Sequence, residues 1–398
     1  MFKPDMPTKK EQYIGIFNDG FPPIIDGVTQ TILNYVDWLR NNGHETCVVT
    51  PYNPESTEVP YKVIRYFSLP IHNRKPYRYG YPKLDPFIWQ KMRNTNFRLV
   101  HSHSPFAAGR LAVYASRKQG IPLIGTFHSK YKSDLKHSFQ LLPWCVPIIM
   151  KRILNFYNSC DEVWIPQASV EETMREYGFK GKIEVVANGI DYGDKEIRDI
   201  DSYKNEARQK LGIKEDEISL LFVGQHIWEK GIGIILDTLK LLNGRVNFKM
   251  TFIGEGYAKK ELKEKIRKSD LDQYVRMEDL ITDREELGMN YAAADLFVFP
   301  SLYDNAPLVV REAASMGTPS IIPIGSTASE IIIDKKNGFL AEPTPESYSD
   351  LIIRLTKDKS MIREAGMNAR NDLVRGWNDV MEEIVDRYEK LIKRFSKK

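Results

Sequence analysis

The sequence of 398 residues has few cysteines and no long apolar segment. Cys47, Cys145 and Cys160 have neither the even number of a disulfide framework nor the spacing of zinc ligands, so we expect buried thiols. The longest uncharged apolar run, Leu141 to Met150, has ten residues and includes two prolines. Because about 20 apolar residues are needed to cross a bilayer, this run predicts no spanning helix. No apolar segment follows the basic residues at the N-terminus, which indicates a cytoplasmic protein without a signal peptide.

Two features that are typical of other enzyme classes are missing or weak. Gly231 to Gly233 and Gly254 to Gly256 each lack the third glycine of a Gly-x-Gly-x-x-Gly motif, which disfavours an NAD-dependent oxidoreductase. Asp-x-Asp pairs occur at residues 199 and 201 and at 270 and 272. The 25 aspartates of this chain give about two such pairs by chance, so the pairs carry no information. We therefore expect no metal site and no other cofactor.

Positive charge is concentrated in the first half of the chain. Residues 1–190 contain 24 Lys and Arg against 16 Asp and Glu, a net charge of +8, whereas the remainder has 33 against 37, a net charge of −4. Within residues 61–93 and 130–157, basic side chains alternate with aromatic and apolar ones. This combination is typical of proteins on anionic membranes, where each cation contributes about 1 kcal/mol. An ordinary solvated loop and a packed helix explain the two stretches equally well, and single-stranded nucleic acid is a less favoured partner.

Short apolar runs alternate with amphipathic stretches along the whole chain, which predicts parallel sheets covered by helices on both faces. The charged passage 191–217 interrupts the alternation and indicates a boundary between two domains, 1–195 and 196–376. Strands are predicted at 13–17, 46–50, 99–101, 123–126, 162–165 and 183–186, and then at 219–223, 249–253, 295–299 and 320–323. Helices are predicted at 28–40, 232–242, 257–268, 307–316 and 377–395.

The turns between strands and helices contain the residues that can bind a ligand. Ligands of open α/β sheets lie beyond the carboxyl ends of the strands, where helix N-termini offer N–H groups to anions. One such turn leads to Gly27, a second carries Lys230, and a third contains Gly254. The fourth contains Asp304, and Glu312 follows eight residues later on the next helix. Two such carboxylates can accept hydrogen bonds from sugar hydroxyls while the helix N-terminus faces a diphosphate, although alone Asp304 could simply cap the helix.

Together these motifs resemble the family 4 retaining glycosyltransferases, and the resemblance covers nearly the whole chain. The motifs are Pro22 to Val28, Gly43 to Glu45, Thr126 to His128, Asn188 to Asp191, Val223 and Gly224 with Lys230 and Gly231, and Asp304 to Glu312 followed by Ala313, Gly317 and Pro319. The resemblance implies the GT-B architecture, in which two Rossmann-like doubly wound domains face each other across a cleft. Domain 1–195 would bind the acceptor and be completed by the C-terminal helix 377–398, and domain 196–376 would bind the nucleotide sugar.

The resemblance also assigns roles to single residues. The catalytic residues would be His128, Lys230 and Asp304. The donor site would comprise Gly27, Gly224, Gln225, Lys230, Gly254, Asp304, Asn305, Ala306, Pro307, Leu308 and Glu312. Candidates on the acceptor side are His101, His103, Lys130 and Tyr131; for the two histidines a structural role is the favoured alternative.

Two departures from the family pattern fall at the donor site. Gln225 stands where the family usually has Arg, and Asp304 stands where it usually has Glu. The expected activity is transfer of a hexose, with retention, from a nucleotide diphosphate sugar to an acceptor hydroxyl. A UDP-sugar is the leading donor, and a lipid or lipid-linked glycan at the inner face of the plasma membrane is the expected acceptor. The departures leave a non-catalytic sugar-nucleotide-binding subunit as the alternative.

Overall fold

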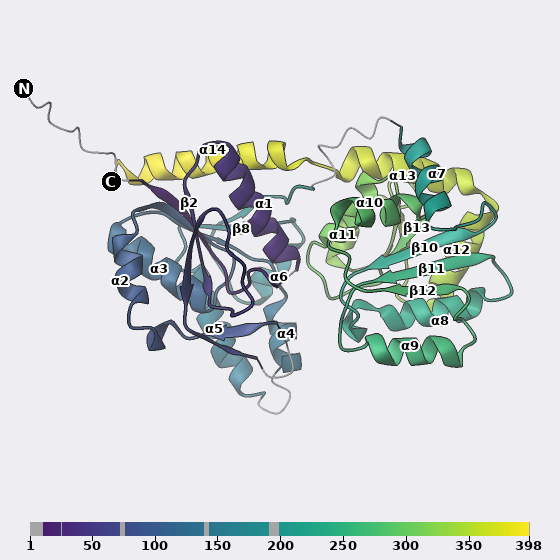
Figure 1. The fold of residues 1–398 in the computed structure, drawn as a ribbon, viewed down its shortest axis with the longest axis horizontal. Coiled ribbons are helices and arrows are strands. Elements are labelled where there is room, and N and C mark those ends of the chain that lie inside the picture. The colour runs from purple at the N-terminus through teal and green to yellow at the C-terminus, as the bar shows by residue number, and fades with distance from the viewer. Residues whose placement is uncertain (1–10, 25, 72–75, 139–142, 191–198, 398) are drawn as a thin grey trace, which may run out of the picture. The chain divides into compact units, whose positions relative to one another are not determined.

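The computed structural model describes residues 11–24, 26–71, 76–138, 143–190 and 199–397. The chain divides into two compact units, which Figure 1 shows with their helices and strands. Unit 1 comprises Met1–Asn188 and Trp377–Lys398, and unit 2 comprises Gly189–Gly376. The structure divides the chain between Asn188 and Gly189. The boundary expected between residues 195 and 196 is a few residues further along the chain and lies outside the described residues.

Unit 1 contains a parallel sheet of seven strands in the order β3-β2-β1-β6-β7-β8-β9. A short antiparallel hairpin, β4 and β5, follows the edge strand β3. The strands are β1 (Tyr13–Phe17), β2 (Thr46–Pro51), β3 (Lys62–Tyr66), β4 (Ser68–Pro70), β5 (Arg78–Gly80), β6 (Phe97–Ser102), β7 (Leu123–Thr126), β8 (Glu162–Ile165) and β9 (Ile183–Val185). The helices are α1 (Gly27–Asn41), η1 (Pro82–Leu84), α2 (Ile88–Asn94), α3 (Ala107–Gln119), α4 (Tyr131–Ser138), α5 (Cys145–Tyr157), α6 (Val170–Glu176) and α14 (Trp377–Phe395).

Unit 2 contains a parallel sheet of six strands in the order β12-β11-β10-β13-β14-β15. In Figure 1, α8 and α9 lie on one side of this sheet, and α10 and α11 lie on the other. The strands are β10 (Ile218–Val223), β11 (Phe248–Ile253), β12 (Val275–Glu278), β13 (Leu296–Val298), β14 (Ser320–Pro323) and β15 (Phe339–Ala341). The helices are α7 (Ile200–Lys210), η3 (Trp228–Lys230), α8 (Ile232–Leu242), α9 (Lys259–Lys268), α10 (Arg284–Ala293), α11 (Leu308–Ser315), η4 (Thr327–Ile331), α12 (Pro345–Lys357) and α13 (Lys359–Leu373).

The predicted α/β class with two doubly wound parallel sheets is confirmed. Every predicted strand is present, within one or two residues at its ends, because the central strands are buried on both faces and read as continuous apolar runs. The prediction omitted the hairpin strands β4 and β5 and three edge strands of the large sheets, β3, β12 and β15. β3 begins with the exposed Lys62, β12 is only partly buried, and β15 has three residues. Of the cysteines expected to be buried, Cys47 is fully buried, whereas Cys145 and Cys160 are partly buried as whole residues. Burial nevertheless raises the pKa of the Cys160 thiol.

Both sheets reverse their direction of winding at a central strand. In unit 1 the chain runs outward from β1 to β3 and then returns to the other side of β1 as β6. In unit 2 it runs outward from β10 to β12 and returns beside β10 as β13. At such a switch point the two loops at the carboxyl ends of the central strands diverge and leave room for a ligand. The fold therefore places the loops after β1 and β6, and those after β10 and β13, where a binding site is expected.

The C-terminal helix α14 belongs to unit 1 because its apolar stripe is buried there. Trp377, Ile384 and Tyr388 lie in one hydrophobic cluster with Tyr35 and Val36 of α1. Figure 1 shows α14 running along unit 1 beside α1. At its first turn the indole Nε1 of Trp38 donates a hydrogen bond to the amide oxygen of Asn378 at 2.8 Å. Among the described residues no helix combines the length and apolarity that crossing a membrane requires.

We expect the substitution Ile384→Ala to lower the free energy of unfolding of unit 1 by about 2 to 5 kcal/mol, because it leaves a cavity in a fully buried position. Urea unfolding measures this loss. Glu382→Ala, two residues earlier on the exposed face of α14, is the control and should change the value by less than about 0.5 kcal/mol. Equal effects of the two substitutions would show that α14 does not contribute to the core.

Candidate functional site

An ion pair lies at the switch point of unit 2. Lys230, in the turn after β10, places Nζ 2.8 Å from Oδ1 of Asp304, in the loop after β13. The two side chains are only 13% and 18% exposed. The ammonium also lies 5.5 Å from the centre of the Phe299 ring. Partial burial strengthens such a pair relative to an exposed one, so the lysine is held in a defined position.

The loop that carries Asp304 is held by further hydrogen bonds. The hydroxyl of Ser301 donates to Oδ2 of Asp304 at 2.6 Å, and the hydroxyl of Thr327 donates to its backbone oxygen at 2.6 Å. Asp304 therefore uses both carboxylate oxygens within unit 2. This geometry makes Asp304 a residue that positions Lys230, in addition to any contact with a sugar.

Glu312 lies on the helix that follows, and it is also engaged on both sides. Arg284, at the start of α10, donates from a terminal guanidinium nitrogen to Oε1 at 3.0 Å, and the hydroxyl of Tyr291 donates to Oε2 at 2.8 Å. The Glu312 side chain is 10% exposed. A carboxylate has about four lone-pair positions, so two hydrogen bonds leave capacity for hydroxyl donors. Glu312 is thus held in one orientation, with capacity for further hydrogen-bond donors.

Two glycines allow the ends of β10 and β11 to approach closely. Gly224 and Gly254 have φ of 154° and 140°, which disfavour a side chain. A Cβ atom on Gly254 would lie 2.1 Å from the backbone oxygen of Gly224. The neighbouring Gln225 is exposed. The predicted donor residues Gly224, Gln225 and Gly254 therefore lie together at one edge of the sheet.

The remaining donor residues lie at the start of α11. Asn305 is 5% exposed, Ala306 is partly buried, and Pro307 is the N-cap residue before Leu308 begins the helix. Asn305, Ala306 and Leu308 carry backbone N–H groups, whereas Pro307 has none, and the hydrogen-bonded residues Asp304 and Glu312 flank this segment.

In unit 1 the loop after β1 is anchored by Asp19. Its carboxylate accepts hydrogen bonds from the hydroxyls of Tyr66 and Ser104 and from the backbone N–H of Ala108 in the first turn of α3. Burial raises the pKa of Asp19, and the hydrogen bonds from Ser104 and Tyr66 oppose that rise. This network ties the loop after β1 to the loop after β6.

Gly27 is the first residue of α1 and is exposed. The preceding Asp26 is the N-cap, and its carboxylate accepts the backbone N–H of Thr29 at 2.8 Å. An anion at this helix terminus would therefore lie beside a carboxylate. The structure places Gly27 at a switch-point loop, but this end of α1 is less favourable for a diphosphate than the sequence pattern suggests.

Three histidines gather at the carboxyl edge of the first sheet. His101 and His103 are 0% and 2% exposed, and His128 is partly buried. Nδ1 of His103 lies 2.9 Å from Nε2 of His128. Burial is the main cause that lowers the pKa of each ring, that of His128 to about 4.

Three of the four acceptor-side candidates are interior residues: His101, His103 and Tyr131. His101 contacts the hydroxyl of Tyr388 through Nδ1 and that of Thr126 through Nε2, both at 2.6 Å. Both ring nitrogens are therefore used within the protein and neither is directed to a substrate. Tyr131 is 6% exposed and packs against Phe127. Burial gives these residues structural roles, which was the favoured alternative for the two histidines. Lys130 remains partly exposed.

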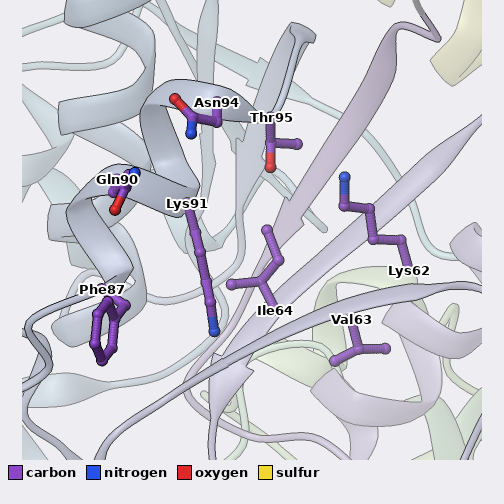
Figure 2. Close-up of a pocket in the computed structure, with 8 residues that line it drawn as sticks. All are labelled: Lys62, Val63, Ile64, Phe87, Gln90, Lys91, Asn94 and Thr95. Atoms are coloured by element: carbon purple, nitrogen blue, oxygen red, sulfur yellow. The ribbon is translucent and has the colours of Figure 1, made fainter.

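A separate hollow of about 520 Å³ lies between β3 and α2, as Figure 2 shows. It is lined by Lys62, Val63, Ile64, Phe87, Gln90, Lys91, Asn94 and Thr95. Because β3 begins at Lys62, the hollow lies at the amino end of this strand, whereas ligands of such sheets lie at the carboxyl ends. It contains none of the predicted site residues. Within the described part of the chain, no three His, Cys, Asp or Glu side chains are grouped so as to hold a metal ion.

Comparison with known proteins defines the class. The family described as Glycosyltransferase Family 4 matches residues 25–193, and that described as Glycosyl transferases group 1 matches residues 203–372. HepE of Anabaena in complex with UDP and glucose superposes with a TM-score of 0.75 at 16% identity, covering 96% of this chain and all of that one. Two doubly wound units with a site at the switch point of the second are thus the GT-B architecture. This chain belongs to the family 4 glycosyltransferases.

Two curated relatives extend over most of the chain. The alpha-monoglucosyldiacylglycerol synthase of Acholeplasma laidlawii is 26% identical over 352 residues, which cover 85% of this chain and 87% of that protein. The UDP-Gal:alpha-D-GlcNAc-diphosphoundecaprenol alpha-1,3-galactosyltransferase of Escherichia coli is 25% identical over 379 residues, covering 92% and 94%.

Sequence reasoning missed Asp19, Arg284 and Tyr291. Arg284 and Tyr291 precede Glu312 by 28 and 21 residues, and Asp19 precedes Ala108 by 89. No local pattern marks such pairs. An aspartate two residues after β1 was the one available signal.

We expect unit 1 to lose stability when the pH falls below the ordinary range of histidine. The folded pKa of His128 is about 4, whereas unfolded histidine titrates near about 6.5. Between these values the unfolded chain binds more protons, so the free energy of unfolding decreases as the pH decreases, and the contribution is complete above about pH 6.5. His101 and His103, with lowered pKa values, act in the same direction.

Urea unfolding at about pH 7.5 and about pH 5 measures this effect. Tryptophan fluorescence reports mainly on unit 1, which holds five of the six tryptophans. The His128→Gln variant lacks one of the titrating rings and should show a smaller difference between the two pH values. An unchanged stability of the parent protein at the lower pH would contradict the burial of these rings.

Proposed function

We propose that the protein transfers a hexose from a nucleoside diphosphate sugar to a hydroxyl of a lipid or lipid-linked glycan, with retention of configuration and without a metal ion. The observation that carries the proposal is the Lys230–Asp304 pair at the switch point of unit 2, with Glu312 fixed nearby on α11. An ammonium for the diphosphate and a carboxylate for the ribose are the two groups that a nucleotide sugar requires.

The proposed reaction does not require a nucleophile from the protein. As the bond between the anomeric carbon and the phosphate oxygen breaks, its electron pair passes to the diphosphate, and Lys230 stabilises the added negative charge. The acceptor oxygen bonds to the anomeric carbon on the same face, and its proton passes to a diphosphate oxygen. Preorganised cations and N–H groups at helix N-termini can serve this step in place of a metal.

The names of the relatives support a UDP-sugar and a lipid acceptor. One relative is named for synthesis of monoglucosyldiacylglycerol, another for transfer from UDP-Gal to a diphosphoundecaprenol-linked sugar, and HepE was solved with UDP and glucose. UDP-glucose is therefore the first donor to test, and GDP-mannose the next. The neutral Gln225 keeps a non-catalytic subunit as the second candidate, because it adds no positive charge at the diphosphate.

A transfer assay with a panel of nucleotide sugars tests this function. We expect turnover with a UDP-sugar and a diacylglycerol or polyprenyl-diphosphate acceptor, unchanged by a metal chelator. Lys230→Ala should lower kcat/KM about 100-fold or more, as removal of one preorganised donor does in other enzymes. Lys240→Ala, an exposed lysine of α8 paired with Asp237, is the control and should retain activity.

Three results would count against the proposal. Donor binding without turnover for any acceptor would favour the non-catalytic subunit. Loss of activity on chelation, with recovery on adding manganese, would refute the metal-independent step. Near-normal turnover of folded Lys230→Ala would remove this lysine from the donor site.

The acceptor proposal also predicts contact with an anionic membrane through unit 1. Six large apolar side chains between residues 67 and 87 are 39 to 65% exposed: Phe67, Leu69, Tyr79, Tyr81, Leu84 and Phe87. In α5, Trp144 at its N-cap and Ile148 are 64% and 48% exposed, close in sequence to the exposed Lys151 and Arg152. Insertion of apolar side chains beside cations is how peripheral proteins bind anionic bilayers.

We expect the protein to sediment with phosphatidylglycerol vesicles in a salt-sensitive manner, and to do so weakly with phosphatidylcholine vesicles. The double substitution of Leu84 and Phe87 by Ser should weaken binding by about tenfold or more, since each buried side chain contributes about 1.5 to 3 kcal/mol. Ile333→Ser, which changes an exposed apolar residue of unit 2, is the control. Equal, salt-insensitive binding to both vesicles would overturn the membrane contact.

A further inference from the structure

His103 is a buried residue that contacts His128, the one histidine that the family resemblance assigns to the catalytic residues. His103 follows β6, and its backbone N–H donates to the oxygen of Phe17 at 2.8 Å, which fixes it to the central strand β1. Its ring packs 4.2 Å from that of His101 and 5.3 Å from that of Tyr35. It lies nearly parallel to the His128 ring, with 18° between the two planes. These contacts hold His103 in place, and Nε2 of His128 contacts its Nδ1.

The hydrogen bond between the two rings contains one proton. Burial lowers the pKa of both rings, so both are neutral at neutral pH. In a neutral imidazole one nitrogen carries the proton and the other accepts. Either His103 donates from Nδ1 to Nε2 of His128, or His128 donates from Nε2 to Nδ1 of His103. The two arrangements give His128 opposite tautomers.

The surroundings of His103 distinguish these arrangements. Its other nitrogen, Nε2, is buried and has no hydrogen-bond partner in the part of the chain that the structure describes. If His128 donated, the proton of His103 would be on this Nε2, and an N–H group would be buried without an acceptor. Orphaned buried N–H groups are rarer than orphaned acceptors and are costly. The lower-energy arrangement places the proton of His103 on Nδ1, directed to His128.

We propose that His103 is a positioning residue that holds His128 in the Nδ1–H tautomer by donating a hydrogen bond to its Nε2. Both nitrogens of His128 are then committed, Nε2 as an acceptor from His103 and Nδ1 as a proton carrier. With a proton on Nδ1 and its Nε2 accepting from His103, the His128 ring has no lone pair with which to act as a general base. The inference rests on the proposed function for the role of His128, and it excludes one mechanism: proton abstraction from the acceptor by this ring.

The tautomer can be measured directly. The chain has seven histidines, so two-bond ¹H–¹⁵N correlation spectra of protein labelled at histidine nitrogens can be assigned with single variants. His128→Gln identifies the His128 signals and His103→Asn those of His103. We expect His128 to show a protonated Nδ1 and an unprotonated Nε2 at neutral pH. A protonated Nε2 on His128 would overturn the proposal.

Two variants of nearly equal shape separate hydrogen bonding from packing. The amide of His103→Asn can donate where Nδ1 did, whereas His103→Leu fills the same space without a donor. We expect His103→Asn to keep kcat within about threefold and the parental His128 tautomer, and His103→Leu to lower kcat about tenfold or more with little change in the donor KM. His44→Asn, outside this cluster, is the control.

Equal activities of the Asn and Leu variants, whether high or low, would refute the positioning role, because both would then report packing alone. A more active Leu variant would refute it too. If the Leu variant does not fold, the spectrum of the parent protein still decides. If the parent transfers no sugar from any donor, the proposed function fails, whereas the spectrum still tests the hydrogen bond between His103 and His128.

Discussion

Parallel pairing of every strand in the two large sheets is the constraint on which the rest of this structure depends. The carboxyl ends of parallel strands lie at the same edge of a sheet, so loops that are far apart in sequence meet at this edge. Lys230 and Asp304 are separated by 74 residues, yet β10 and β13 are neighbours and bring them to 2.8 Å. The same topology in unit 1 brings Asp19 to Ser104 and His103 to His128.

Two charged groups of the proposed donor site in unit 2, Lys230 and Glu312, are each held by a partner of opposite charge. The ammonium of Lys230 faces Asp304, and the carboxylate of Glu312 faces Arg284. A cation that is already fixed and partly desolvated responds to developing phosphate charge without reorganisation, which is the basis of electrostatic catalysis. The same pairing limits the cost of burying these charges in the absence of substrate. Asp304, one of the two departures from the family pattern, contacts Lys230 directly.

The first unit uses its polar residues differently. His101 links β7 to α14 through Thr126 and Tyr388, so the C-terminal helix is connected to the edge of the sheet where His128 lies. Burial, and to a lesser extent the neighbouring histidines, lower the pKa values of His101 and His103 and keep both rings neutral. The direction of their hydrogen bonds, rather than their charge, therefore governs what these rings do. Exposed aromatic residues, by contrast, lie in and beside the hairpin of β4 and β5 and on either side of η1.

The sequence by itself determined the class of fold, the central strands and the residues Lys230, Asp304 and Glu312, because buried parallel strands are continuous apolar runs and these residues stand in local turn motifs. It did not determine the edge strands β3, β12 and β15, because β3 and β12 are only partly buried and β15 has only three residues. Nor did it determine what the site residues contact. Arg284 beside Glu312, Asp19 beneath α3 and the burial of His101 and Tyr131 were decided only by the tertiary structure, since they depend on which strands become neighbours, and strand order leaves no periodic pattern in the chain.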